Sequence, residues 1–455
     1  MPSFIQEVSS AVPAFVGYTH KHRRGKTSLR YKPTRVASIA DYELLFGGPL
    51  SATISLLLRS DNTPDGNITI AQPRSFMYHC LHFYFANGGG PCYIVSAGGY
   101  HATGQAQTTR AGQLGKALKA LEGIDEATLL CLPDACLLKE DSFFNLSKEA
   151  LRQSALLKDR FALLDVQHPP DITAQNSAHF TTAFRKGIGL EHLRYGAAYF
   201  PWIRTGQVPF VDQNDPAVLS IRGGTGLPAS LVLRSEAAGD DSLFHFNRAL
   251  YDIIMSAVTH SNVALPPSIA AAITCVQVDQ KHGVWKAPVN ISLKNAIAPL
   301  VTISTAQAEE LNIDLAEGKS INLIRTFPNK GTMVWGARTL AGNDNEWRYV
   351  SVQRFCNMIE ESSKKGIESF VVYGSNATTW SKVRSLMENY LMQLLRRGAL
   401  AGARPEHAFY VRIGPGQTMT QQDILEGRMI TEVGVAIVRP AEFIVLRFIH
   451  QMQGP

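Results

Sequence analysis

Short apolar runs alternate with amphipathic stretches through the first half of the chain, and this rhythm restricts the fold more than any other feature. Apolar runs of strand length lie at residues 14–17, 92–96, 128–135, 161–166 and 195–202. Between two of them, Leu114, Leu118 and Leu121 recur at the spacing of one helical face. Short apolar strands separated by helices are typical of a mostly parallel sheet that is covered on both faces. The sequence therefore predicts an α/β domain over residues 20–345.

Residues 205–265 interrupt this rhythm. They are rich in loop-forming residues and contain one clear helical pattern, near 242–258. We expect them to form an insertion that packs on the same domain.

Residues 346–440 predict a compact α+β unit. The expected order is a helix that ends at Gly366, a strand at 369–374, an amphipathic helix that ends at Gly398, a strand at 408–414, and a short helix or strand lead-in at 420–429. The fold class is thus α/β plus α+β.

The chain ends on an apolar run, from Val433 to Pro455, although chain ends are usually polar and frayed. In an extended conformation, Ile444, Leu446, Phe448 and Met452 point one way, whereas Phe443, Val445, Arg447 and Ile449 point the other way. The opposite end, residues 3–8, also reads as a short extended arm. Neither end has an obvious hairpin partner in the sequence, so both need a sheet to join.

Composition excludes some classes of protein. The chain has 455 residues, of which 45% are hydrophobic and 18% charged, so it is neither disordered nor membranous. The segment Met1–Phe4 has no basic or apolar signal region, and the six cysteines form no Cys-x-x-Cys pair. We therefore expect no secretory signal and reduced, mostly buried thiols in a cytosolic product.

The net charge of +6 is concentrated in one place. Seven basic residues and no acidic one lie between His20 and Ala40, so the rest of the chain carries a formal charge of −1. A polyanion-binding arm is one interpretation of this basic stretch. A solvated loop, or a patch that meets an acidic face of another protein, is favoured because no series of aromatic residues alternates with the basic ones and no nucleic-acid motif is present.

Several residues are of types that bind metals or take part in catalysis. His79 and His82 share a helical face, but no further ligand follows at a zinc-site spacing. Asp134 and Asp165 end apolar strands, where α/β enzymes place catalytic groups, but an aspartate there is also a common helix cap. The glycine-rich segments 87–91 and 222–226 match no phosphate-binding motif and are read as turns. We therefore expect no catalytic residue, no metal site and no cofactor.

Ten stretches, in order along nearly the whole chain, resemble the sheath proteins of contractile phage tails, R-type tailocins and extracellular phage-tail-like injection systems. They are "PSFIQEV…AFVG", "ADYELLFGG", "FYFANGGGPCYIV", "LLCLPDA", "YGAAYFPW", "PPSIAAAI", "HGVWKAPVN", "LNIDLAEGKSINLIRTFPNKGTMVWGARTL", "WRYVSVQRFCNMIEES" and "GRMITEVGVAIVRPAEFIVLRFIHQM". The basic stretch 20–35 and the 205–265 region have no counterpart in this resemblance.

The resemblance implies a structural subunit that polymerises around an inner tube in a metastable extended state. Contraction then drives the tube through a target envelope without ATP. It also implies linking arms at residues 1–19, which include the first strand, and at 441–455, which add strands to neighbouring subunits. The arm residues are Phe4, Ile5, Val8, Phe443, Ile444, Val445, Leu446, Phe448 and Ile449.

The resemblance further implies an inner-tube contact from the C-terminal unit, and its position suggests Gln422, Asp423, Glu426 and Arg428. The expected partners are further copies of the chain, the tube protein, sheath paralogues, and baseplate and terminator or cap proteins. Neither nucleic-acid binding nor membrane insertion is expected. Assembly is expected in the bacterial cytoplasm, as part of a virion tail or a released extracellular particle.

The sequence is also compatible with two other functions. One is a baseplate or tail-terminator component that binds a sheath without contracting. The other is an α/β enzyme that binds a nucleotide or sugar at the carboxyl ends of its sheet.

Overall fold

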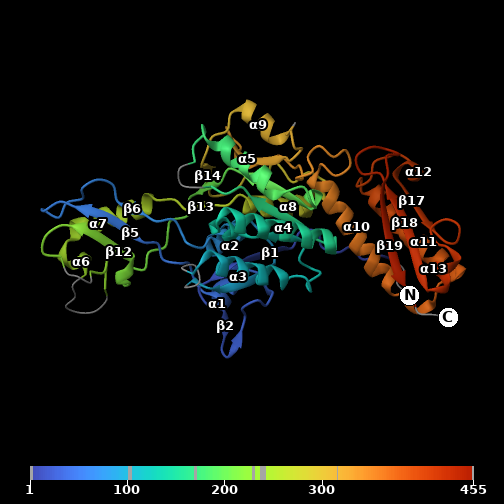
Figure 1. Cartoon of the computed structure of the whole chain (residues 1–455), viewed down its shortest axis with the longest axis horizontal. Helices are drawn as coiled ribbons and strands as arrows, with labels where there is room; N and C mark the ends of the chain where they lie inside the picture. Colours follow the sequence, from blue (N-terminus) through green and yellow to red (C-terminus); the bar gives the residue numbers. More distant parts are fainter. Residues whose placement is uncertain are drawn as a thin grey trace.

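The computed structural model describes residues 4–100, 105–168, 172–227, 231–235, 242–314 and 316–452. Three units follow one another along the long axis of the molecule (Figure 1). A small lobe lies at one end, a large sheet with its helices in the middle, and a helix-and-sheet unit at the other end. Both chain ends lie in this last unit.

The central sheet has eight strands in the order β16-β15-β10-β9-β8-β1-β7-β4. Its inner strands run parallel, as the apolar runs predict, and the two edge strands are antiparallel. The parallel strands are β1 (Pro13–Thr19), β7 (Cys92–Gly99), β8 (Leu129–Cys131), β9 (Phe161–Asp165), β10 (Gly196–Phe200) and β15 (Ile321–Phe327). The edges are β4 (Thr34–Val36) and β16 (Gly331–Trp335). The expectation of a mostly parallel sheet is confirmed.

Helices cover both faces of this sheet. One face packs against α3 (Gln107–Lys119), α4 (Glu140–Leu157), α5 (Ser177–Ile188) and α9 (Thr305–Asn312). The other packs against α1 (Ile39–Phe46), α2 (Met77–Ala86) and α8 (Ser268–His282). Within β1, Ala14 and Val16 face the first layer, whereas Phe15 faces the second. A strand buried on both faces needs apolar residues at every position, which explains the continuous apolar runs.

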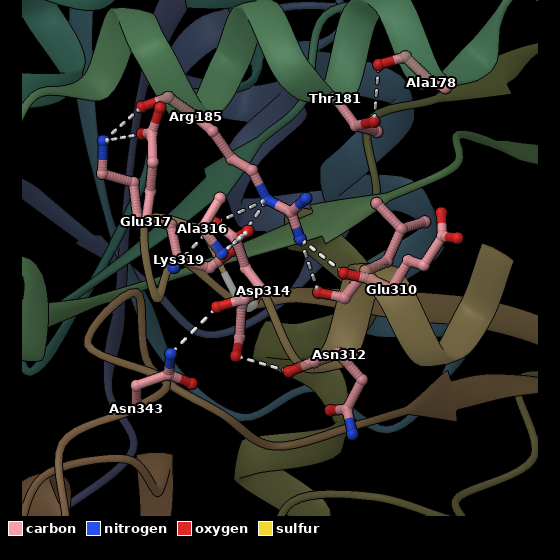
Figure 2. Close-up of polar contacts among 12 residues, drawn as sticks. Ala178, Thr181, Arg185, Glu310, Asn312, Asp314, Ala316, Glu317, Lys319 and Asn343 are labelled. Carbon is pink, nitrogen blue, oxygen red and sulfur yellow. Dashed lines mark hydrogen bonds and ion pairs between the residues drawn. The ribbon is translucent and has the colours of Figure 1, made fainter.

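The polar contacts of Arg185 hold α9 and the following loop against α5 (Figure 2). The Arg185 guanidinium donates to the carbonyls of Glu310, Leu311 and Lys319 at 2.8–3.1 Å. It also lies 3.4 Å from the Asp314 carboxylate. This cluster lies just before β15, which is the second strand from one edge of the sheet.

The lobe corrects the expectation of an insertion at 205–265 that packs on the α/β domain. Two distant segments build it, because β5 (Ile54–Leu58) pairs in parallel with β12 (Leu219–Gly223). With β6 (Thr69–Ile70), α6 (Leu243–Phe246) and α7 (Arg248–His260), they enclose a separate apolar core. A three-stranded sheet of β11 (Ile203–Thr205), β13 (Ala264–Leu265) and β14 (Ala296–Pro299) lies where the chain enters and leaves the lobe.

The C-terminal unit packs two long helices on a three-stranded antiparallel sheet. The helices are α10 (Val350–Glu368) and α11 (Ala377–Arg396), and the sheet has the order β17-β18-β19. Two details differ from expectation. Helix α10 continues past Gly366 to Glu368, and the strand expected at 369–374 is the short 3-10 helix η5 (Val371–Tyr373).

Candidate functional site

The apolar run at the end of the chain forms an antiparallel hairpin. Strand β18 (Arg428–Val435) pairs with β19 (Ile444–Gln451), from Arg428 opposite Gln451 to Val435 opposite Ile444. The predicted alternation of faces is present, because Ile444, Leu446 and Phe448 are buried against the helices whereas Val445 and Ile449 are exposed. Strand β19 lies at the edge of its sheet.

The expectation that this run has no partner within its own chain is therefore wrong: in the isolated subunit, its two halves pair with each other. A pairing over the whole length of both strands joins them. The sequence did not reveal it because Pro440 and polar neighbours separate the two apolar halves of the run by a loop longer than a common hairpin turn.

The loop between the strands, residues 436–443, is anchored at its ends and open in its middle. The Ala436 amide donates to Ala408 and the Ala441 amide to His407, and the Phe443 ring lies 5.2 Å from the Tyr410 ring. Val438 and the residues up to Glu442 are exposed. The loop thus covers little apolar surface and could change conformation without disturbing the core.

The N-terminal segment lies across the helices of the same unit. The Ile5 side chain is buried against Gly366, the Val8 amide donates to Ser362 Oγ at 3.0 Å, and Glu7 pairs with Arg397. Phe4 is exposed. From this segment the chain continues directly into β1, a central strand of the large sheet.

The four residues suggested for tube contact lie together on α13 (Gln421–Leu425) and the start of β18. Arg428 pairs with both Asp423 and Glu426, and Gln422 donates to Glu426. Hydrogen bonds from Thr420, reinforced by Arg428, lower the pKa of Asp423 to about 2. The polar groups are therefore already linked to one another, and the side chain that stands free is Leu425, which is 86% exposed.

The basic stretch forms a small projecting hairpin of β2 (Arg23–Arg24) and β3 (Thr27–Ser28). Arg23, Arg24 and Lys26 are exposed at its tip, whereas Arg30 bends back to donate to the Ala97 carbonyl. Six of the seven basic residues of the stretch are exposed, and only Arg30 is partly buried.

Asp134 and Asp165 are structural caps. Asp134 accepts from the amides of Tyr18 and Phe76 and from Ser75 Oγ, just before α2 begins. Asp165 accepts from the amide and hydroxyl of Ser268, the first residue of α8, at 2.6 and 2.7 Å. Burial raises the pKa of both carboxyls, that of Asp165 to about 7. Both aspartates cap a helix, but neither caps the helix that follows it directly: Asp134 caps the start of α2, which precedes it, and Asp165 caps α8, which starts about a hundred residues later.

His79 is not part of a metal site in the described residues. Its Nδ1 lies 3.0 Å from Gln207 Oε1, and its ring is buried, which lowers its pKa. His82 is exposed. Across the described ranges, histidine, cysteine and carboxylate side chains form no group of three suited to a metal ion. None of the described helices is long and apolar enough to cross a bilayer.

Sequence reasoning missed a buried polar junction between the units. Arg354 on α10 pairs with Asp279 on α8, and the Ser10 hydroxyl and carbonyl complete the contact. These residues are far apart in the sequence, and none belongs to a recognisable motif, so no local signal could have grouped them.

Comparison with known proteins shows which protein family the C-terminal unit matches. Residues 342–450 match the family of the phage tail sheath C-terminal domain. Comparison with curated proteins gives no match.

Three solved structures match over nearly the whole chain. The sheath of the PVC extracellular contractile injection system, in its contracted state, is 26% identical with a TM-score of 0.61, covering 98% of this chain and 93% of that one. The contracted helical sheath of the anti-feeding prophage is 27% identical with a TM-score of 0.62, covering 98% and 94%. A chain of that prophage's contracted baseplate is 25% identical with a TM-score of 0.66, covering 97% and 94%. Residues 342–450 thus match a phage tail sheath C-terminal domain, and the chain as a whole is similar to the sheath proteins of contractile injection systems, which supports a structural sheath subunit.

Proposed function

We propose that this subunit polymerises around an inner tube in an extended, metastable state and contracts to drive the tube through a target envelope. Whole-length similarity to the PVC and anti-feeding prophage sheaths, both solved in the contracted state, supports this proposal. A barrier between two packings of the subunits holds the extended state. Contraction is driven by the free energy of new contacts between the folded subunits and uses no ATP.

Exchange of strand β19 between subunits links the polymer. This step is supported by the position of β19 at the edge of its sheet. It pairs with β18 along its whole length, and the loop that joins the two strands is exposed in its middle. The eight residues 436–443 can span at most about 26–29 Å when extended, which sets the reach to a neighbour's β18. Domain exchange of this kind conserves the contacts made within one chain.

The exchanged strand provides enough burial for a durable joint. Ile444, Leu446 and Phe448 bury apolar surface worth on the order of 5 kcal/mol in a neighbour's core, which opposes withdrawal of the strand once it is exchanged. Because the same burial is present in the closed chain, exchange changes mainly the loop conformation and the entropy of association. Because every subunit exchanges its strand β19, each one stays linked to its neighbour while the rest of the subunit moves during contraction.

The N-terminal arm is the second link. Ile5 and Val8 lie in the same apolar core that β19 covers, and Phe4 next to them is exposed, so both ends of the chain converge on one unit. Baseplate and cap proteins, sheath paralogues and a tube protein are the further partners. The subunit assembles in the bacterial cytoplasm and becomes part of a released particle or virion tail, as the extracellular contractile relatives suggest.

The α13 segment contacts the tube. Its network of Gln422, Asp423, Glu426 and Arg428 fixes the turn, and the free Leu425 side chain supplies apolar contact. Leu425→Ala is expected to give sheaths without tubes when both proteins are co-expressed. Tube-filled sheaths at the wild-type frequency would exclude this contact.

Disulfide trapping tests the strand exchange. Glu432 and Arg447 are register partners across the hairpin, so cysteines at both positions can bridge if the local geometry allows. In polymers oxidised and run on a denaturing, non-reducing gel, exchange gives a ladder of covalent oligomers. A hairpin closed within each subunit gives a monomer band of altered mobility. The single variants Glu432→Cys and Arg447→Cys control for bridges to the native cysteines.

Deletion of residues 441–455 is the complementary test. Negative-stain microscopy of the wild type is expected to show tubes or stacked rings, and the deletion to leave folded subunits that do not polymerise. Unchanged polymers after this deletion would refute the linking role of the C-terminal arm, without refuting a sheath function.

A further inference from the structure

A cavity of about 1230 Å³ opens at the carboxyl ends of three central strands of the large sheet. It is lined by Leu137 after β8, Gln167 after β9 and Trp202 after β10. In open α/β sheets, ligands bind at this edge, outside the carboxyl ends of the strands. The volume is somewhat larger than the roughly 300–1,000 Å³ typical of small-ligand pockets.

The walls of this cavity combine aromatic rings with positive charge. Phe76, Phe143, Phe180 and Trp202 supply rings, and the charged lining residues among those described are Arg74, Arg110, Arg204 and Glu140. Among the described lining residues, three arginines thus accompany one glutamate. The surface suits a molecule that has an apolar body and a negative charge.

Arg110 carries the inference, because its guanidinium is buried and incompletely paired. Its side chain belongs to a residue that is only 6% exposed. Nη1 makes a long hydrogen bond of 3.4 Å to the Leu137 carbonyl, whereas Nε and Nη2 have no hydrogen-bond partner within the part of the chain that the structure describes. The guanidinium also lies 5.8 Å from the centre of the Tyr18 ring.

The nearby carboxylate does not satisfy this charge. Asp134 uses its oxygens to accept from two backbone amides and from Ser75. A buried guanidinium with free N–H groups is costly, since it has lost water without gaining an equivalent partner. Nε and Nη2 are themselves enclosed by protein, so an anion in the cavity would act by offsetting the positive charge of the guanidinium.

We propose that this cavity binds a small organic anion, a carboxylate, phosphate or sulfonate carried on an aromatic or aliphatic body. The anionic group pairs with Arg110, and the body packs on Phe180 and the neighbouring rings. Occupancy stabilises the folded subunit by mass action. The site is separate from both chain ends and from α13, so it does not depend on the proposed linking or tube contacts.

Fluorescence titration of the full-length protein with anilinonaphthalene sulfonate, an aromatic anion, tests the site. We expect saturable binding that Arg110→Met weakens at least tenfold, because the side-chain volume is nearly conserved and the charge is lost. Arg152→Met, which removes an exposed guanidinium on α4, is the control and is expected to leave the isotherm unchanged. Binding by Arg110→Met equal to wild type overturns the proposal.

A second variant keeps the test decisive if Arg110→Met fails to fold. Phe180 is only partly buried, so Phe180→Ala is expected to fold and to weaken probe binding several-fold. An unchanged isotherm for Phe180→Ala places the probe elsewhere and overturns the proposal.

Competition distinguishes the chemical sources of the anion. AMP and decanoate present a phosphate or a carboxylate on an apolar body, whereas inorganic phosphate presents the charge alone. Displacement by AMP or by decanoate at lower concentration than by inorganic phosphate supports the site and names its preferred class. Equal displacement by inorganic phosphate overturns the requirement for an apolar body.

Discussion

Arg354 Nη2 and Asp279 Oδ2 lie 2.6 Å apart, in a contact that joins the C-terminal unit to the large sheet domain. Both side chains are less than one-tenth exposed. Ser10 donates its hydroxyl to Asp279 and accepts from Arg354 through its carbonyl, so the N-terminal segment shares the contact. Burial opposes the charge of Arg354, but the Asp279 carboxylate outweighs it and raises the pKa of the guanidinium.

Arg354→Met is expected to lower the free energy of unfolding by roughly 3–5 kcal/mol, because it leaves the buried Asp279 carboxylate without its cation. Urea unfolding measures the loss. Arg152→Met breaks an exposed pair with Glu149 and should cost less than about 1 kcal/mol. A similar small loss for both variants would show that the buried pair contributes little.

Adjacent positions on β19 provide a second, matched comparison. Phe448→Asp is expected to destabilise the C-terminal unit by at least roughly 3–5 kcal/mol, since it removes a buried ring and places a carboxylate in the core. Ile449→Asp, at a side chain that is 62% exposed, should change stability by less than about 0.5 kcal/mol. Unfolding of dissociated subunits measures both. Equal effects would mean that β19 does not bury the face assigned to it.

Much of the large sheet could be predicted because its strands are buried on both faces. The run 161–166, for example, is apolar at nearly every position, and β9 occupies it. The faces of β19 were also predictable, because alternation fixes them whatever the partner strand is. The partner itself was not, since pairing with β18 depends on the path of an irregular loop.

The lobe shows why other features could not be predicted. β5 and β12 pair across more than 150 residues of sequence, and neither segment carries a local sign of the other. The strand predicted at residues 369–374 is absent for a different reason. Their apolar and β-branched composition suits a strand, but Phe370 alone is buried, whereas Val372 and Tyr373 are largely exposed. Tertiary packing on α10 thus overrode the local preference.

Of the candidate site residues, the sequence placed the arm positions at the chain ends and the tube-contact positions near α13, and both roles remain predictions. It could not show that Asp423, Glu426 and Arg428 pair with one another, because charge pairing depends on the turn of α13. The Arg110 cavity was also hidden. Its lining comes from segments between Gln72 and Leu300 that only the folded sheet brings together.

Asp165 predicts a pH dependence of stability. Burial raises its pKa to about 7 in the folded chain, against about 3.9 when unfolded. Between these values the folded state retains a proton that the unfolded state has released, so stability is complete at the acidic end and falls as the pH rises. Asp165→Asn should remove this fall, which amounts to roughly 4 kcal/mol over the window.

Urea midpoints at several pH values between about 4 and about 7 measure the difference in slope. Loss of the hydrogen bond from the Ser268 hydroxyl lowers the stability of Asp165→Asn at every pH, so the slope is the informative quantity. Asp141→Asn, at an exposed position on α4, should keep the wild-type slope. Identical slopes for Asp165→Asn and wild type would mean that the buried carboxyl titrates normally.

The Arg185 cluster makes the final prediction, which concerns local rather than global stability. Arg185→Met removes donors to three backbone carbonyls and the cation beside Asp314, a loss of roughly 2–3 kcal/mol. Two of the freed carbonyls, those of Glu310 and Leu311, lie at the end of α9, so amide hydrogen exchange should accelerate there before it does in β15. Lys186→Met, at the exposed neighbouring position on α5, should leave exchange in α9 unchanged. If α9 exchanges at the wild-type rate in Arg185→Met, apolar packing by Ala308 and Leu311 rather than the polar cluster holds this helix in place.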